Sequence, residues 1–201
     1  NDMIINIGVR VDYFDSDGQV LNDITDPDIY RPRKDQNIIK TLEERKLSNA
    51  NGDPWYRDAE TEFKLSPRLG IAFPITDRGV IHFSYGHFFQ NPNFEPMFEN
   101  NQYDLNVREP LFGQPSLDAT RTISYEVGVA HQFSDNVALN VTAYYRDITG
   151  LIGTRYFFPF IDGRYTGYTL YVNEDYANNK GVEFTLDIRP TRYFSGGLTY
   201  T

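Results

Sequence analysis

Residues 121–152 read RTISYEVGVAHQFSDNVALNVTAYYRDITGLI, and this stretch decides the fold. Apolar and polar side chains alternate along it, which is the pattern of a β-strand with two unlike faces. The tripeptide Ser-Asp-Asn at 134–136 interrupts the alternation and is typical of a tight turn. The apolar positions are Ile123, Tyr125, Val127, Val129 and Phe133 before the turn, and Val137, Leu139, Val141, Ala143 and Tyr145 after it. The stretch therefore predicts two antiparallel strands joined as a hairpin.

The same alternation recurs in five further stretches, and together they predict an all-β chain. We expect strands at about residues 3–14, 62–73, 79–89, 120–133, 137–148, 178–189 and 193–201, and long loops at 15–61, 90–119 and 149–177. The best helix candidate is short and lies within the first loop, at residues 37–47. Long loops and tight turns alternate along the chain. An antiparallel up-and-down sheet would therefore have every long loop at one end and every tight turn at the other.

The length and polarity of these strands favour a transmembrane β-barrel over a soluble sheet. Each full strand runs for about 10 to 13 residues, and a tilted strand needs about 9 to 11 to cross the hydrocarbon of a bilayer. One face is almost free of charge, as a lipid-facing band should be. The other face carries charges that are rarely buried in a packed interior but suit a water-filled lumen. This polar wall would include Arg10, Asp12, Arg68, Glu126, Arg146 and Glu183.

Composition excludes several other classes of protein. The chain has 201 residues, with 28 Asp and Glu against 19 Lys and Arg, a formal net charge of −9 and no cysteine. The acidic balance argues against a nucleic-acid binder. The lack of cysteine excludes disulfides and Cys-ligated metal sites. No apolar run approaches the roughly 20 residues of a membrane helix, and we do not expect Asn1 to be a natural secretory N-terminus.

Three hairpins of this chain carry a family resemblance. Residues 65–94, LSPRLGIAFPITDRGVIHFSYGHFFQNPNF, join a Ser-Pro-Arg strand to a Ser-Tyr-Gly strand that ends in aromatics. Residues 121–152 join a Glu-bearing strand to a Tyr-rich strand through a short Asp/Asn turn, and residues 171–201 contain a Lys-Gly-x-Glu strand. In this order, the three hairpins resemble those of TonB-dependent outer-membrane receptors.

The resemblance implies a much larger protein in the outer membrane of a Gram-negative bacterium. Receptors of this family have a barrel of about 22 strands with an N-terminal plug domain in its lumen. They take up scarce, bulky nutrients, driven by an energy-transducing inner-membrane complex that engages a TonB box. This sequence shows no plug, no TonB box and no terminal strand ending in an aromatic residue. About seven strands cannot close such a barrel, so we expect an incomplete, internal piece of it.

Few chemical sites stand out, and we expect neither an enzyme nor a cofactor. Asp15 and Asp17 open an acidic loop that could hold calcium through carboxylate oxygens, although the full EF-hand spacing is absent. The three histidines, His82, His87 and His131, fall on different faces by strand parity, so no shared metal site is expected. No nucleophile elbow or phosphate-binding glycine loop is present.

Aromatic residues near the long-loop end form the candidate ligand-binding surface. They are Trp55, Tyr56, Phe88, Phe89, Tyr156, Phe158, Tyr165 and Tyr168, and Asp162-Gly163 suits a type I′ hairpin turn among them. Tyrosine offers a flat apolar face and a hydroxyl, which suits sugars, peptides or aromatic chelators. The alternative is that these rings pack together where the hairpin extends the barrel wall.

Three functions remain open from the sequence. The first is binding and transport of a siderophore, cobalamin, glycan or peptide by a TonB-dependent receptor, with the plug, the TonB complex and the lipid bilayer as partners. The second is a binding or adhesion barrel of the outer membrane without energised transport. The third is a soluble secreted β domain that binds glycans. The nutrient itself cannot be read from the loops.

Overall fold

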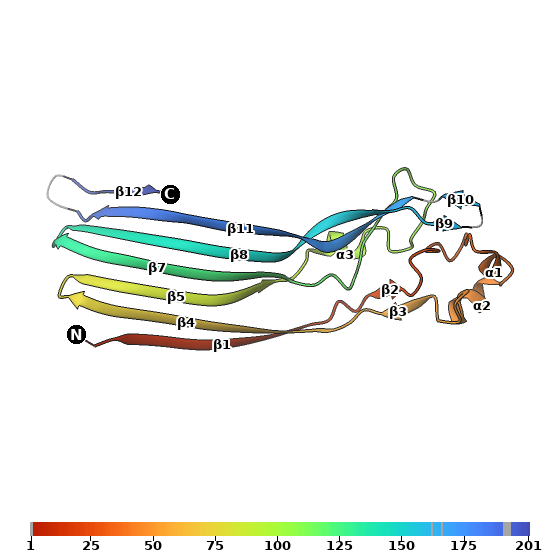
Figure 1. The fold of residues 1–201 in the computed structure, drawn as a ribbon, viewed down its shortest axis with the longest axis horizontal. Helices are drawn as coiled ribbons and strands as arrows, with labels where there is room; N and C mark the ends of the chain where they lie inside the picture. The colour runs from red at the N-terminus through yellow and green to blue at the C-terminus, as the bar shows by residue number, and fades with distance from the viewer. Residues whose placement is uncertain (1, 162, 166, 191–193) are drawn as a thin grey trace.

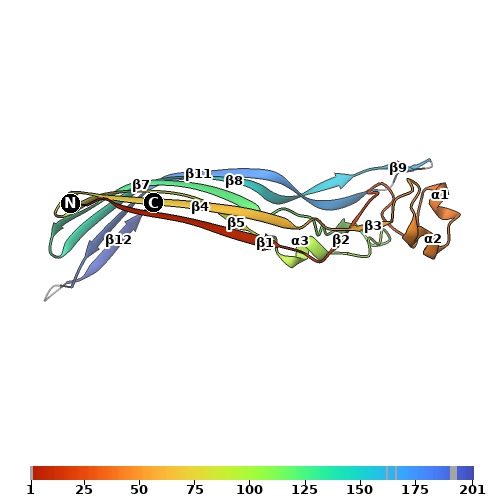
Figure 2. The same ribbon diagram turned by 90° about the horizontal axis from the view of Figure 1, so that it is seen from below.

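The computed structural model describes residues 2–161, 163–165, 167–190 and 194–201, and most of them form one long antiparallel sheet (Figure 1). Its strands pair in the order β1 (Ile4–Phe14), β4 (Glu62–Thr76), β5 (Gly79–Gln90), β7 (Thr120–Ser134), β8 (Val137–Phe157), β11 (Tyr168–Ile188) and β12 (Gly196–Tyr200). In the described part of the chain the sheet is open, with β1 and β12 at its edges. Figure 2 shows a single curved layer, so neither face is covered by a second sheet.

The tight turns and the long loops lie at opposite ends of this sheet. The turns from β4 to β5 and from β7 to β8 lie at one end, here called the short-turn end. The loops lie at the other, the long-loop end. There they include β2 (Gln19–Leu21) paired with β3 (Tyr56–Asp58), and β9 (Phe160–Ile161) paired with β10 (Arg164–Tyr165). They also include β6 (Leu111–Phe112), which runs parallel to β11, and α3 (Phe94–Phe98).

Two strands are much longer than the sequence predicts. β8 and β11 have 21 residues each and pair from Tyr168↔Phe157 to Ile188↔Val137. Most of the interval 149–177, expected to be a long loop, is therefore strand. Gly150, at φ +73°, and irregular register around Asp175 break the alternation that the prediction relied on. Pairing between the two strands continues across this interruption, and the hairpin rises beyond the rest of the sheet. Of the predicted turn at its tip, Asp162 lies outside the described residues.

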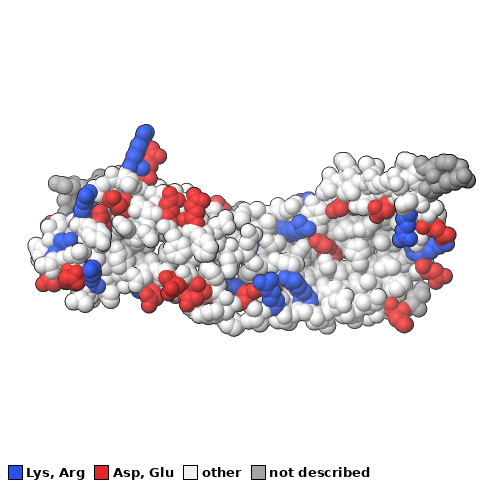
Figure 3. Space-filling view, turned by 180° about the vertical axis from the view of Figure 1, so that it is seen from behind, with Lys and Arg blue, Asp and Glu red and all other residues white. Residues whose placement is uncertain are grey.

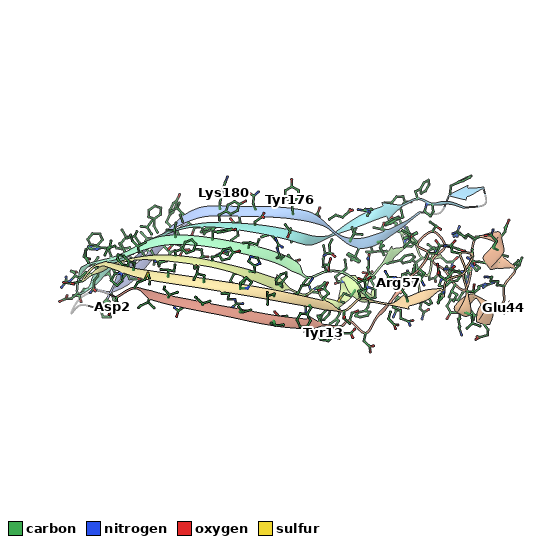
Figure 4. The ribbon with its side chains drawn as sticks, turned by 60° about the horizontal axis from the view of Figure 1, so that its bottom comes forward. Asp2, Tyr13, Glu44, Arg57, Tyr176 and Lys180 are labelled. Carbon is green, nitrogen blue, oxygen red and sulfur yellow. The ribbon has the colours of Figure 1, made fainter. Side chains whose placement is uncertain are left out.

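The two faces of the sheet differ as the alternation predicts. The apolar face carries exposed side chains such as Ile7, which is 78% exposed, whereas Ser66 on the polar face is 1% exposed. Tyr85, Tyr125 and Tyr145 lie in register on the apolar face, with ring centres 5.1 Å and 6.3 Å apart. Figure 4 shows Lys180, the register partner of Tyr145, projecting from β11 on the same side as Tyr176.

The first long loop contains two short helices where one was predicted. α1 (Asp35–Ile38) and α2 (Leu42–Leu47) are separated at Thr41, which caps α2. The Glu44 amide donates to Thr41 Oγ1 at 3.4 Å, and the Thr41 amide donates to Glu44 Oε2 at 2.8 Å. Threonine is more favourable at an N-cap than inside a helix. The capping box at Thr41 therefore begins α2 rather than continuing α1.

Aspartates hold this loop together from within. Asp26, which is 1% exposed, accepts hydrogen bonds from the amides of Arg33 at 2.8 Å and Lys34 at 3.2 Å, and from Asn37 Nδ2 at 2.8 Å. Asp28 accepts the amides of Tyr30 and Arg31, both at 3.0 Å. These carboxylates accept hydrogen bonds from partly buried backbone amides of the loop.

Replacing Asp26 with Ala should therefore unfold part of the loop. Two backbone amides and one side-chain amide would lose their acceptor, and we expect a cost of about 2 kcal/mol. Amide exchange over residues 26–38 would measure this cost. Asp53→Ala, at an exposed position of the same loop, is the matched control. Equal loss of protection in both variants would contradict this account.

Among the described helices, none is both long and apolar enough to cross a membrane.

Candidate functional site

The polar face of the sheet holds a hollow of about 400 Å³ near β1, β4, β5 and β7. Glycine and serine form much of its lining: Gly8, Gly70, Ser84, Gly86 and Ser124. Arg68 and Phe88 stand at its border, where the guanidinium carbon lies 4.7 Å from the ring centre. Figure 3, seen from behind, shows charges of both signs lying across the sheet and loops. The hollow can therefore receive a polar partner close to the backbone of the wall.

Glu126 is the centre of a polar network beside this hollow. Its carboxylate accepts hydrogen bonds from Ser84 Oγ at 3.3 Å, Ser124 Oγ at 3.4 Å and Arg146 Nη2 at 3.2 Å. The donors come from β5, β7 and β8, in neighbouring register. The Glu126–Arg146 pair remains partly exposed, so both charges can still reach a partner on the polar face.

The other predicted wall residues lie on the same face. Arg10 pairs with Asp12 at 2.6 Å on β1, and in the register of β1 with β4 they lie opposite Ser66 and Lys64. Glu183 accepts a hydrogen bond from Thr185 Oγ1 at 3.3 Å on β11. Together with Arg68, Glu126 and Arg146, these residues give the polar face charges of both signs.

A hydrophobic core lies among the loops, at the long-loop end of β11. Its buried members are Tyr103, Phe112, Tyr168 and Leu170. The ring of Phe112 lies 5.2 Å from that of Tyr103 and 4.9 Å from that of Tyr168, centre to centre. Tyr168 Oη donates to the carbonyl of Ile24, and Tyr103 Oη donates to that of Gln19 at 3.4 Å. The core thus joins the first loop, the second loop and β11, and we call it the loop core.

Burial in the loop core changes the acidity of its tyrosines. Burial raises the pKa of Tyr103 to about 12. Burial also raises the pKa of Tyr168, and neighbouring Asp23 adds to the effect. Both hydroxyls therefore stay protonated and act as hydrogen-bond donors across the physiological range.

The eight predicted ligand-binding aromatics do not form one surface. Trp55 is 2% exposed and Tyr168 is 1% exposed. Trp55 Nε1 donates to the carbonyl of Pro27 at 3.3 Å, and Tyr56 stacks on Tyr103 at 6.0 Å. These three rings are used in packing; of the three, Tyr168 belongs to the hairpin for which packing was the alternative interpretation.

The remaining predicted aromatics lie in two other places. Phe88 and Phe89 belong to β5; Phe88 packs against Arg68, and the ammonium of Lys64 lies 5.8 Å from the Phe89 ring centre. Tyr156 and Phe158 are 62% and 55% exposed and stack at 5.8 Å. The side chain of Tyr165 lies outside the described residues. Tyr156 and Phe158 are thus the predicted aromatics that the structure leaves most open to a ligand.

A charged cluster ties the second loop to the start of β4. Lys64 Nζ lies 3.2 Å from Glu62 and 3.4 Å from Asp118, and Glu62 accepts the Ala119 amide at 3.3 Å. Burial and the hydrogen bond with Asp118 raise the pKa of the Glu62 carboxyl, whereas the hydrogen bond from Glu62 lowers that of Asp118. Of the two carboxyls, Glu62 is therefore the one that takes up a proton first as pH falls. This cluster could not be predicted from sequence, because Asp118 lies 54 residues from Lys64 along the chain.

The attachment of the second loop should depend on pH. A carboxyl with a raised folded pKa stabilises the fold when protonated, so stability falls as pH rises from 4.5, the ordinary Glu value, through the folded pKa of Glu62. Asp118 works in the opposite sense and loses its contribution below 3.8. Glu62→Gln keeps a donor at every pH and should remove the loss at higher pH. Protection of the Ala119 amide, corrected for intrinsic exchange, measures this effect, and Glu60→Gln is the exposed control. An unchanged pH dependence in Glu62→Gln would contradict the raised pKa of the Glu62 carboxyl.

The predicted calcium residues form a local turn. The Asp17 amide donates to Asp15 Oδ1 at 2.9 Å, and Asp17 has φ +50°. Within the described ranges, no group of three or more His, Asp or Glu side chains could hold a metal ion. His82 lies by Thr142 on the polar face and His87 by Tyr85 on the apolar face, so these two do not converge.

Comparison with known proteins gives one family and several similar folds. The family model described as "TonB dependent receptor-like, beta-barrel" matches residues 1–201. No curated protein matches the chain. Among solved structures, a mutant (G324V) of the ferric enterobactin receptor PfeA from Pseudomonas aeruginosa is 19% identical, with a TM-score of 0.55 over 69% of this chain and 22% of that one. The FrpB iron transporter from Neisseria meningitidis, as apoprotein, is 14% identical, with a TM-score of 0.52 over 95% of this chain and 22% of that one. The chain thus spans about a fifth of the length of these structures.

Proposed function

Because the chain belongs to the TonB-dependent receptor β-barrel family, we propose that it forms part of the wall of a receptor that binds a scarce, bulky nutrient outside the cell and passes it into the periplasm. The family is one of transporters, not enzymes, and its members lie in the outer membrane of Gram-negative bacteria. The apolar face of the sheet then contacts lipid, the polar face borders the lumen, and the long-loop end faces the outside.

The observation that carries the proposal is the division of the chain into three environments. A single-layer sheet has one apolar face and one charged face, and a folded loop region stands at only one of its ends. A soluble glycan-binding domain would not leave such an apolar face open to water. An outer-membrane receptor uses all three: lipid contact, a lumen and an external entrance.

The polar face suits a plug domain as its partner. Glu126 and Arg146 offer charges of both signs beside a hollow lined by glycine and serine. Charge-assisted hydrogen bonds from a plug to Arg68, Glu126 or Arg146 would hold the plug in place and would be exchanged when it moves. Energy would come from a TonB complex acting through that plug.

Uptake by whole cells tests the proposal. A strain that lacks the receptor would be supplied with ferric siderophores, cyanocobalamin, oligosaccharides or peptides, each labelled. Since the similar solved structures include an iron transporter and a ferric enterobactin receptor, ferric siderophores are the first class to test. We expect uptake of one class to disappear with the receptor and equally with loss of TonB. Uptake that survives loss of TonB would instead favour a non-energised binding barrel.

A further inference from the structure

A small cavity lies against the loop core and has not been assigned a role. Its volume is about 130 Å³, and its apolar lining consists of Val20, Leu21, Ile24, Tyr103, Tyr168 and Leu170. An apolar cavity of roughly 150 Å³ can hold a benzene molecule, so a single six-membered ring is the size that fits here. The two tyrosine hydroxyls already donate to backbone carbonyls, which leaves their rings as lining.

A second, polar hollow adjoins this cavity. It has a volume of about 420 Å³ and is lined by residues that include Glu60, Glu62, Lys64 and Asp118. Arg57 and Ser116 line both spaces, so they stand at the junction between them. Figure 4 shows Arg57 between the end of the sheet and the outermost loops. A molecule seated in the apolar cavity would thus place its polar end at Arg57 and Ser116.

Arg57 is the cation at the junction that can accept an anion. Glu62 and Asp118 both pair with the single ammonium of Lys64, at 3.2 Å and 3.4 Å. Among the described residues, the ion pair of Arg57 is a loose one with Glu60, at 3.6 Å, and Glu60 is largely exposed. Exposed ion pairs of this kind contribute little to stability, so the Arg57 guanidinium can release Glu60 and bind a ligand carboxylate through two parallel hydrogen bonds. Ser116 Oγ accepts from Gln114 Nε2 at 3.3 Å, which leaves its own hydrogen to donate.

We propose that this cavity binds an aromatic carboxylate, with its ring against Tyr103 and Tyr168 and its carboxylate on Arg57 and Ser116. The site rests on the proposed function, in which such a group is the part of the nutrient that the loops recognise first. The volume of the cavity sets the size of the ligand's ring, and the positive charge of Arg57 requires a negative charge on the ligand.

Binding of 4-fluorobenzoate to the full-length receptor in lipid nanodiscs, followed by fluorine NMR, tests this site. 4-Fluorobenzamide has the same shape without the charge. We expect the benzoate to bind about tenfold or more tightly than the amide, because a charged hydrogen-bond pair is formed. Arg57→Gln should abolish this preference while leaving the amide unchanged, and Ser116→Ala should weaken the benzoate alone by about threefold.

Two further variants complete the experiment. Arg78→Gln is the matched control, because Arg78 is about as exposed as Arg57 and pairs with Asp135 at the short-turn end, 3.0 Å away. Ile24→Trp should block the cavity and remove both probes; Ile24 is 41% exposed, so the larger ring can be accommodated. A preference for the benzoate over the amide that survives Arg57→Gln, or benzoate binding that survives Ile24→Trp, would overturn the proposal.

Uptake separates this inference from the proposed function. If the wild-type receptor takes up its nutrient but binds neither probe, the cavity assignment is wrong and transport stands. If it binds 4-fluorobenzoate with the expected variant pattern but loss of the receptor leaves uptake of every nutrient class unchanged, the cavity stands and the transport proposal is wrong.

Discussion

Phe184→Arg is expected to destabilise the assembled receptor by about 2–4 kcal/mol, the range for arginine at the middle of a lipid-facing strand. Phe184 lies on the apolar face of β11, with Val141 and Tyr200 as its register partners. It is midway between Lys180 and the strand end at Ile188. A guanidinium at this depth would lose hydration without gaining a partner.

The neighbouring position supplies the control for this experiment. Thr185→Arg places the same charge one residue along β11, on the polar face beside Glu183. We expect a change of less than about 1 kcal/mol, because the new group stays in water and can pair with a carboxylate. Unfolding by urea in phospholipid vesicles would measure both variants. Equal losses of unfolding free energy in the two variants would contradict the assignment of one face of β11 to lipid and the other to water.

Tyr168→Ala is expected to cost about 3–5 kcal/mol within the loops, as for other large buried aromatic residues cut back to alanine. Its ring packs against Phe112 and Phe157, with centres 4.9 Å and 5.6 Å away, and its hydroxyl donates to the Ile24 carbonyl. Because these contacts connect both long loops to β11, amide protection in 15–61 and 90–119 should fall together. Protection of β4, β5 and β7 should persist.

Two variants separate the contributions of ring and hydroxyl. Tyr168→Phe keeps the ring and removes one hydrogen bond, so about 1 kcal/mol should be lost. Tyr156→Ala removes an aromatic residue that is largely exposed and should leave loop protection almost unchanged. Full protection of both loops in Tyr168→Ala would show that the loop core does not hold them.

The sheet could be predicted from sequence because its signal is local. In β7, residues two positions apart lie on the same face of the strand and are alike in polarity. Val127 and Glu126 could therefore be assigned to opposite faces without any tertiary information. The turn at 134–136 was equally readable. The extensions of β8 and β11 were not, because Gly150 and the irregular register near Asp175 interrupt the period while pairing continues. In that interval, the partner strand determines the structure.

The loops could not be predicted for the same reason. Tyr103 and Phe112 lie in a stretch without periodicity, and their burial depends on Tyr168, which is more than fifty residues away in the chain. Trp55 and Tyr56 were predicted to bind a ligand, but sequence alone does not distinguish an aromatic ring buried in a core from one exposed to a ligand. Arg57, between them and β4, carried no pattern at all; only the adjoining cavities single it out.

The long β8–β11 hairpin has a mechanical consequence. Tyr168 and Leu170 belong both to β11 and to the loop core. The outer region is therefore built on the same strand as the membrane-spanning part. Pairing of β8 with β11 continues from one part into the other. We expect the outer part of the β8–β11 hairpin and the loop core to stay in place during transport. Any movement that closes the entrance over a nutrient would then come from loops on the opposite side of the barrel.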